Sequence, residues 1–199
     1  MKNLPRFLAP AVLLALFACN GPKPSAAARA EQAATPAPTI NPNSNLAEAN
    51  AAPPHVVGSE YASMVAADDL FEIASANLAL HKTRNADIRN LAQALIPTHQ
   101  QSLAQLKAAA ASARPPITVK PAINPDQQAK LDALRNLAGP AFDHTFLQQQ
   151  IDAHGAALKL IAAFAADGDV PTLKQHALAV EPTVHDHSTR AQDLRATLK

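Results

Sequence analysis

Residues 171–199 of the chain read PTLKQHALAVEPTVHDHSTRAQDLRATLK. One face of this stretch recurs at alternating steps of four and three residues, the spacing of the inward seam of a helix in a bundle. The seam positions are Leu173, Ala177, Val180, Val184, His187, Ala191, Leu194 and Leu198. All of them are apolar except His187. The stretch therefore predicts a long helix that packs against other helices and turns one imidazole towards the core.

Three earlier segments share this helical period, over residues 59–82, 87–113 and 142–166. No segment alternates with the period of two that marks a half-buried strand. The composition agrees, since 46 alanines, 5 glycines and 4% aromatic residues suit helices better than a β-sandwich or barrel. We therefore expect an all-α domain over residues 59–199, built as a four-helix bundle.

A shorter helix is predicted between the second and third long helices, from about residue 125 to 138. Asn124 is a good N-cap residue, and Pro125 suits the first helical position. Gly139-Pro140 is expected to end this helix. The next long helix then begins near Phe142, and Asp143 is interpreted as its N-terminal capping or dipole-favoured acid.

The N-terminus has the features of a lipoprotein signal peptide over residues 1–18. Basic Lys2 and Arg6 precede an apolar run that is too short to span a membrane. The run ends in Leu16-Phe17-Ala18-Cys19, which resembles a bacterial lipobox. This resemblance implies acylation of Cys19, the only cysteine, and anchoring in the bacterial cell envelope, at the outer membrane facing the periplasm. The alternative is cleavage elsewhere and release of a free periplasmic protein.

Residues 19–58 are predicted to be a disordered tether rich in proline and alanine. The stretch has few large apolar residues, so burial cannot offset the entropy of ordering it. The formal net charge of the whole chain is +1, which gives no support to nucleic-acid binding. A single cysteine also excludes a disulfide framework and any multi-cysteine metal site.

Polar residues on the inward stripes form the candidate site. His99, His154 and His187 each replace an apolar residue in the seam of a different predicted helix. Glu72 lies at the edge of the inner face of the first helix. Three imidazoles and a carboxylate are a reasonable ligand set for one zinc, iron, copper or manganese ion.

A structural polar network is the competing interpretation, in which these histidines are hydrogen-bonded core residues. Pro97 and Pro182 lie inside predicted helices, and each would free the carbonyl four residues earlier, at Gln93 and Leu178. Such carbonyls are acceptors for buried imidazole N–H groups. A third possibility is that the polar residues share no cluster at all. The remaining histidines are expected at the solvated surface: His55, His81, His144, His176 and His185.

The order of several short motifs resembles a known bacterial family of secreted proteins and lipoproteins, domain of unknown function 4142. The motifs are Glu72-Ile73, His99, Gly139 followed by Phe142-Asp143, His154, and Pro182 followed by His187. The resemblance covers roughly residues 60–198 and implies a ferritin-like fold, without supplying an activity.

A di-iron oxidase is not expected despite that fold. Such bundles place a carboxylate three residues before a metal-binding histidine, where this chain has Ile96, Ile151 and Val184. No serine elbow is present, and the single thiol is used by the anchor, so an enzyme is not predicted. The sequence predicts an envelope lipoprotein whose core polar cluster binds one transition metal or acts as a structural network. The alternative is a non-catalytic structural or interaction module at the membrane with a hydrogen-bonded polar core.

Overall fold

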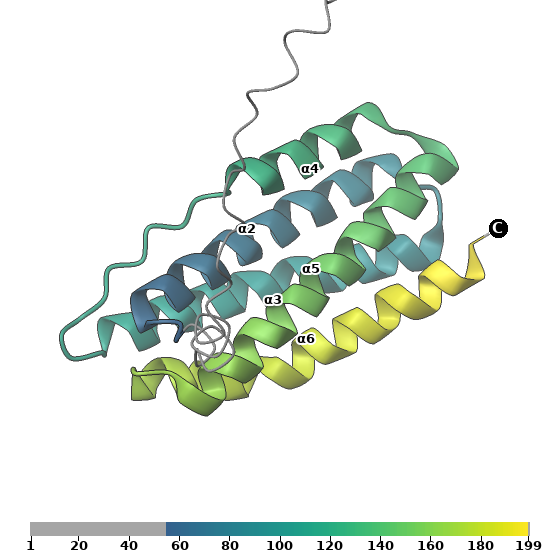
Figure 1. Cartoon of the computed structure of the whole chain (residues 1–199). Coiled ribbons are helices and arrows are strands. Elements are labelled where there is room, and N and C mark those ends of the chain that lie inside the picture. Colours follow the sequence, from purple (N-terminus) through teal and green to yellow (C-terminus); the bar gives the residue numbers. More distant parts are fainter. Residues whose placement is uncertain (1–54, 199) are drawn as a thin grey trace, which may run out of the picture. The chain divides into compact units, whose positions relative to one another are not determined.

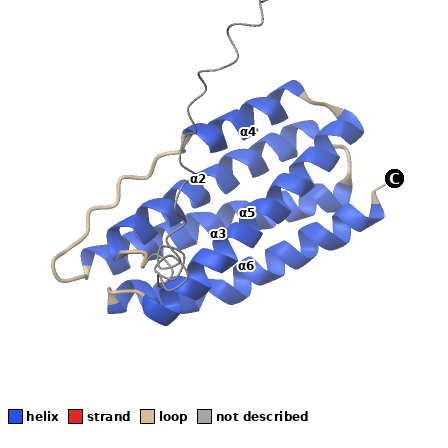
Figure 2. Cartoon of the chain, in the orientation of Figure 1, coloured by secondary structure: helices blue, strands red, loops and turns tan. Residues whose placement is uncertain are grey.

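The computed structural model describes residues 55–198, which form five helices and no β-strand (Figure 2). The four long helices are α2 (Gly58–Lys82), α3 (Ala86–Ala111), α5 (Gly139–Asp167) and α6 (Pro171–Thr197). The shorter α4 (Pro125–Asn136) lies between α3 and α5 in the chain. The prediction of an all-α bundle with one short extra helix is therefore confirmed. Cys19 and almost all of the predicted tether lie outside the described residues.

Asparagine side chains cap the starts of two helices, and the cap at Asn124 was predicted. The Asn85 side chain accepts hydrogen bonds from the backbone N–H groups of Asp87 and Ile88 at the start of α3. At the start of α4, Asn124 and Gln127 form a reciprocal capping box, in which each side chain bonds the other residue's backbone. These contacts satisfy N–H groups that a helix start leaves without partners.

The start of α5 differs from the prediction. Gly139 and Pro140 open this helix instead of ending the previous one, because Pro fits the first turn, where no N–H donor is needed. Gly139 has a φ of 57°, a left-handed conformation that glycine adopts readily. The N-cap is Ala138, which makes no side-chain bond. Asp143 therefore lies in the second turn, and its predicted role as a helix cap is wrong.

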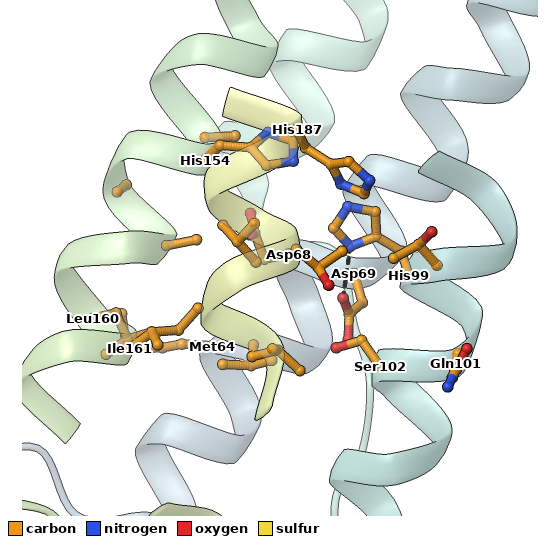
Figure 3. A pocket seen from close by; sticks show the side chains of 18 of the residues that line it. Met64, Asp68, Asp69, His99, Gln101, Ser102, His154, Leu160, Ile161 and His187 are labelled. Carbon is orange, nitrogen blue, oxygen red and sulfur yellow. Dashed lines mark hydrogen bonds and ion pairs between the residues drawn. The ribbon is translucent and has the colours of Figure 1, made fainter. Parts of the chain in front are cut away.

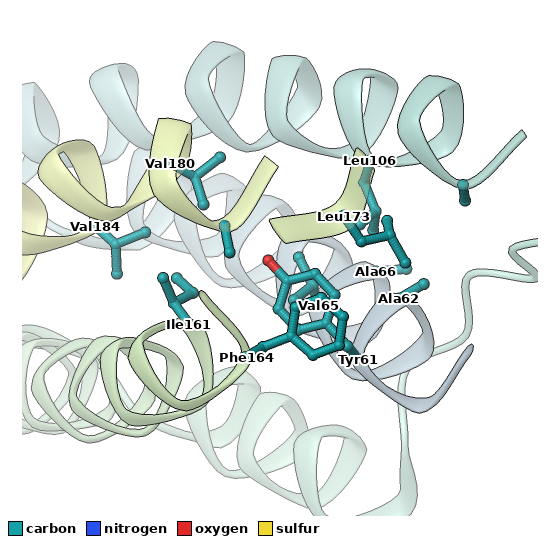
Figure 4. Packing of buried hydrophobic residues seen from close by; sticks show 12 residues of the cluster. Tyr61, Ala62, Val65, Ala66, Leu106, Ile161, Phe164, Leu173, Val180 and Val184 are labelled. Atoms are coloured by element: carbon teal, nitrogen blue, oxygen red, sulfur yellow. The ribbon is translucent and has the colours of Figure 1, made fainter. Parts of the chain in front are cut away.

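The long helices surround two apolar clusters at opposite ends of the bundle. One cluster combines the start of α2 with the end of α3, the end of α5 and the start of α6 (Figure 4). The other combines the end of α2 with the start of α3, the start of α5 and the end of α6. This distribution makes α2 antiparallel to both α3 and α5, and α6 antiparallel to them as well. Because α3 and α5 then run in the same direction, the chain between them must return along the bundle, as in ferritin-like folds.

That returning connection contains α4, which lies along the outside of α2 and also touches α5 (Figure 1). Leu131 of α4 is buried against Phe71 of α2 and Ala153 of α5. At the end of α4, Lys82 Nζ donates hydrogen bonds to the carbonyls of Arg135 and Leu137, at 2.6 and 2.9 Å. None of the described helices is long and apolar enough to cross a membrane.

The opposite end of α2 is fixed by the loop before α6. The backbone N–H of Gly58 donates to Asp169 Oδ1 at 2.8 Å. Asp169 therefore caps the start of α2. The start of α6, two residues after Asp169, has no side-chain cap. The two ends of the bundle are thus closed by contacts between segments far apart in the sequence.

Candidate metal centre

A polar layer separates the two apolar clusters in the middle of the bundle. His99 of α3, His154 of α5 and His187 of α6 lie in this layer, between the apolar residues of their own seams. All three are buried. One ligand nitrogen from each lies within 4.8 Å of the others, and the ring centroids are 5.5 to 5.7 Å apart. The structure therefore brings the three predicted histidines to one level, which their spacing in the sequence could not establish (Figure 3).

Hydrogen bonds orient two of these rings. His99 Nδ1 is 2.8 Å from Asp69 Oδ1, and His154 Nδ1 donates to the carbonyl of Gln150 at 2.8 Å. With Nδ1 carrying the proton, Nε2 of each ring has a lone pair. Within residues 55–198, His99 Nε2, His154 Nε2 and His187 Nδ1 have no hydrogen-bond partner. The orientation of a metal-binding imidazole through its other nitrogen follows the same pattern.

All three imidazoles are neutral at physiological pH. Burial lowers the pKa of His99 to about 4. Burial, reinforced by the neighbouring His99, lowers the pKa of His154 to about 3, and the same two causes lower the pKa of His187 to about 4. A neutral imidazole is the form that binds a metal.

Three carboxylates of α2 lie beside the imidazoles. Asp69 is buried, and burial raises its pKa to about 7, while the Ser102 hydroxyl and His176 act in the opposite direction. Burial and the neighbouring Asp69 raise the pKa of Asp68 to about 7 as well, against the opposing effect of Lys130. The core side of α2 therefore carries a second buried carboxyl group, Asp69, beside the predicted Glu72.

Glu72 is completely buried, but it does not belong to the compact group of three ring nitrogens. Its Oε1 lies 4.0 Å from His154 Nδ1, the nitrogen that already binds the Gln150 carbonyl. Burial and the nearby Asp68 raise the pKa of Glu72 well above its usual value. The structure thus places Glu72 near the Nδ1 atom of His154 and outside the compact donor group.

Asp69 is the contact that the sequence analysis missed. Asp68 and Asp69 are consecutive charges near the middle of α2, a pattern typical of a solvated face. The spacing of Asp69 and Glu72 could have placed Asp69 on the inner side of the helix, because residues three apart on a helix share a face. Glu72 had already been assigned to the inner side.

His176 corrects a second expectation. It was predicted at the solvated surface, but it is 5% exposed. Its Nδ1 is 3.1 Å from the hydroxyl of Tyr61, and its Nε2 is 3.4 Å from the carbonyl of Ser102. The Tyr61 ring itself stacks on Phe164. His176 therefore belongs to a hydrogen-bonded group in the apolar cluster at the start of α2, where its partner Tyr61 could not be assigned from spacing.

The other secondary candidates lie away from the imidazole cluster. His55, His81 and His185 are exposed as predicted, whereas His144 is half-buried. The carbonyls of Gln93 and Leu178, which were expected to accept imidazole protons, do not do so for His99 or His154. Asp69 and Gln150 take those positions instead.

A cavity of about 350 Å³ lies against the cluster. His99, His154 and His187 all contribute to its wall, together with Asp68 and Asp69 of α2. Figure 3 shows the three rings gathered at one side of this cavity and Met64 further along it. Met64 is 47% exposed, so the cavity reaches the molecular surface at its outer part.

The fold and this layer define a ferritin-like four-helix protein with a buried three-histidine cluster. The family model for the domain of unknown function DUF4142 matches residues 43–194, so the chain belongs to that family. No curated protein sequence matches the chain.

Solved structures of the same fold include two metal-bound forms of one protein, CopM, and a fragment of another protein. The Cu(II)-bound form of CopM is 15% identical, with a TM-score of 0.62, and the match covers 73% of this chain and 99% of CopM. The Ag-bound form of CopM is 17% identical, with a TM-score of 0.56 and coverage of 69% and 93%. A DUF305 fragment from Deinococcus radiodurans is 15% identical, with a TM-score of 0.62 and coverage of 71% and 96%. At these identities the likeness establishes the fold alone.

Proposed function

We propose that this protein binds a single transition-metal ion through His99, His154 and His187. The observation that carries the proposal is the set of three buried ring nitrogens, one from each histidine, that lack partners among the described residues. The three histidines come from three helices, and one ligand nitrogen of each lies within 4.8 Å of the other two. An imidazole nitrogen buried without a partner destabilises a fold, because it has lost its hydrogen bond to water. One metal ion would satisfy all three nitrogens.

The competing function, a structural or interaction module with a hydrogen-bonded core, has weaker support. Asp69 contacts Nδ1 of His99, and the Gln150 carbonyl contacts Nδ1 of His154. The Nε2 atom of each of these two rings has no hydrogen-bond partner among the described residues. A core that had only a structural role would gain by replacing these rings with leucine, as at the other seam positions.

Copper is the metal that we propose first, followed by zinc. Imidazole suits both ions, and affinities for a given site rise from manganese through iron to copper, with zinc below copper. Oxygen ligands, which manganese prefers, are not part of the compact donor group. The copper- and silver-bound CopM structures, which share the fold, support testing copper first. Glu72 is assigned a supporting role near His154 Nδ1 rather than a bond to the ion.

The proposed setting is the bacterial cell envelope. The signal-like residues 1–18 and the lipobox-like junction at Cys19 support a lipid anchor at the outer membrane, with the helical domain facing the periplasm. Residues 20–58 would then act as the tether between the anchor and the bundle. In this setting the protein would hold or buffer a metal ion, and no reaction is assigned to it.

Thermal melting with and without metal tests the proposal. The protein should be purified without a nickel column and melted with Cu(II), Zn(II), Fe(II) or Mn(II), or with a chelator. A ligand that binds only the folded state stabilises it by about 2.7 kcal/mol at a hundredfold excess over Kd. We expect stabilisation by Cu(II) and Zn(II) that disappears in His154→Gln.

His185→Gln is the matched control, since His185 is exposed and lies outside the cluster. It should leave the metal-dependent shift intact. A shift that survives His154→Gln and disappears in His185→Gln would place the metal on the surface. The absence of a shift with any metal would refute the metal site and favour the interaction module.

A further inference from the structure

The cavity beside the three imidazoles raises the question of what reaches a metal bound there. Its inner wall includes all three histidines, and its outer part includes the exposed side chains of Gln101, Gln105 and Asn124. A volume of about 350 Å³ lies at the lower end of the range of small-molecule sites. The helices therefore cover the polar layer, but a small molecule can reach it through the cavity.

The donor count leaves a coordination position without a protein ligand. Among the described residues, the compact donor group has three members, all of them histidines. A structural metal site is normally closed by four protein ligands, whereas three protein ligands leave one position for an external molecule. Glu72 is not a member of the compact donor group, and its Oε1 lies 4.0 Å from His154 Nδ1.

Charge indicates what kind of molecule this position prefers. The compact donor group contains no carboxylate, and Asp68, Asp69 and Glu72 lie outside it, so a divalent ion held by the three rings has no negatively charged protein ligand bound directly to it. Charge in a buried site is strongly unfavourable unless it is paired. A small anion that entered through the cavity would supply both a fourth donor atom and a compensating charge.

We propose that a divalent ion held by His99, His154 and His187 keeps one coordination position open to the cavity, where it takes a small anionic ligand from solution. This inference rests on the proposed function and extends it, because it makes the metal exchangeable and reactive towards small molecules rather than sealed in the core. The exchange is a simple substitution, in which the anion displaces a bound water and no electron is transferred.

Azide is a suitable probe, because its complexes with Cu(II) have a charge-transfer absorption band that free Cu(II) and azide lack. The protein is loaded with one equivalent of Cu(II), its metal content is checked by elemental analysis, and azide is titrated. We expect a saturable band with a stoichiometry of one azide per copper, and a matching change in the electron paramagnetic resonance spectrum.

Filling the cavity should block azide and leave the metal. Ala157 lines the cavity and is half-buried, so Ala157→Phe projects a ring into this space. We expect at least a tenfold loss of azide affinity with unchanged copper content. Ala163→Phe is the control, because Ala163 lies on the exposed side of the same helix.

The outcomes separate the two proposals. If copper binds in a His154-dependent manner but azide has no spectral effect on the wild-type protein, the open position is refuted and the metal site stands. If azide binds only after Asp68→Asn, Asp68 itself occupies the fourth position, which also overturns the inference. If no copper binds, the proposed function fails and the open position fails with it. The wild-type titration decides the question even if Ala157→Phe does not fold.

Discussion

Replacing Asp69 with asparagine should change stability and metal affinity in opposite directions. Asp69 is 3% exposed and makes one contact that matters for the site, between its Oδ1 and His99 Nδ1 at 2.8 Å. Asparagine keeps nearly the same shape and retains an oxygen that accepts a hydrogen bond, but it carries no charge. The variant therefore separates the effect of the buried charge from the effect of the contact.

The metal-free protein should be stabilised at high pH by Asp69→Asn. Burial raises the pKa of Asp69 from 3.8 to about 7, so the folded state favours the protonated carboxyl. Below pH 4 the carboxyl is protonated in both states and has no unfavourable effect. As the pH rises from about 4 to about 7, the folded state must bury a charge that the unfolded state exposes, and stability falls. A shift of about three units corresponds to an upper limit of roughly 4 kcal/mol.

Urea unfolding in the presence of a chelator measures this effect. The difference between Asp69→Asn and the wild-type protein should be small at pH 4 and reach its largest stabilising value at pH 8. Asp193→Asn, at an exposed position of α6, should show no such change. If Asp69→Asn is instead destabilised by a similar amount at both pH values, the ionised carboxylate stabilises the metal-free fold, and the reasoning is wrong.

The metal affinity of the same variant should fall. Loss of a partner that orients a metal-binding histidine typically reduces affinity by about 10- to 100-fold, or about 1.4 to 2.7 kcal/mol. A competition titration with a chromophoric copper chelator at pH 8 would measure it. An unchanged affinity would show that Asp69 does not act on the metal through His99.

Three further predictions concern separate parts of the chain. Gly155→Ala should stabilise α5 by about 0.5 to 1 kcal/mol in urea unfolding, since an added Cβ meets no atom within 4 Å; a destabilised variant would mean that this space is needed. Tyr61→Phe should destabilise the fold by about 1 to 3 kcal/mol, because it removes the partner of buried His176, and copper titration should find an unchanged affinity; a lost affinity would link the two polar groups. Cys19→Ser should move the protein from the membrane to the soluble periplasmic fraction in cell fractionation, and a variant that stays membrane-bound and normally processed would contradict the lipid anchor.

The helical fold could be predicted because local signals and seam periodicity agreed. Asn124 caps α4 where expected, and the stripe from Leu173 to Leu198 lies along the core side of α6. The error at Gly139-Pro140 arose because this pair suits both the end of one helix and the start of another. Only the packing of residues 142–147 against the bundle decides between the two.

The sequence predicted the inward positions of the three histidines but not the residues that surround them. The three histidines were recognised because each interrupts an apolar seam, a property of one helix at a time. Asp69 and His176 owe their roles to contacts across helices, with His99 and Tyr61 respectively. Such contacts depend on the axial offset between helices, which periodicity within one helix does not contain.

The position of the three histidines also has a mechanical consequence. They lie on α3, α5 and α6, which are separated by long stretches of chain. An ion bound to all three would act as a cross-link that closes two long loops. Closing a long loop lowers the conformational entropy of the unfolded chain more than closing a short one. The chain has no second cysteine with which to form a disulfide. Metal binding would therefore act as a reversible cross-link, so the free energy of unfolding of the bundle would rise when the ion is abundant and fall when it is scarce.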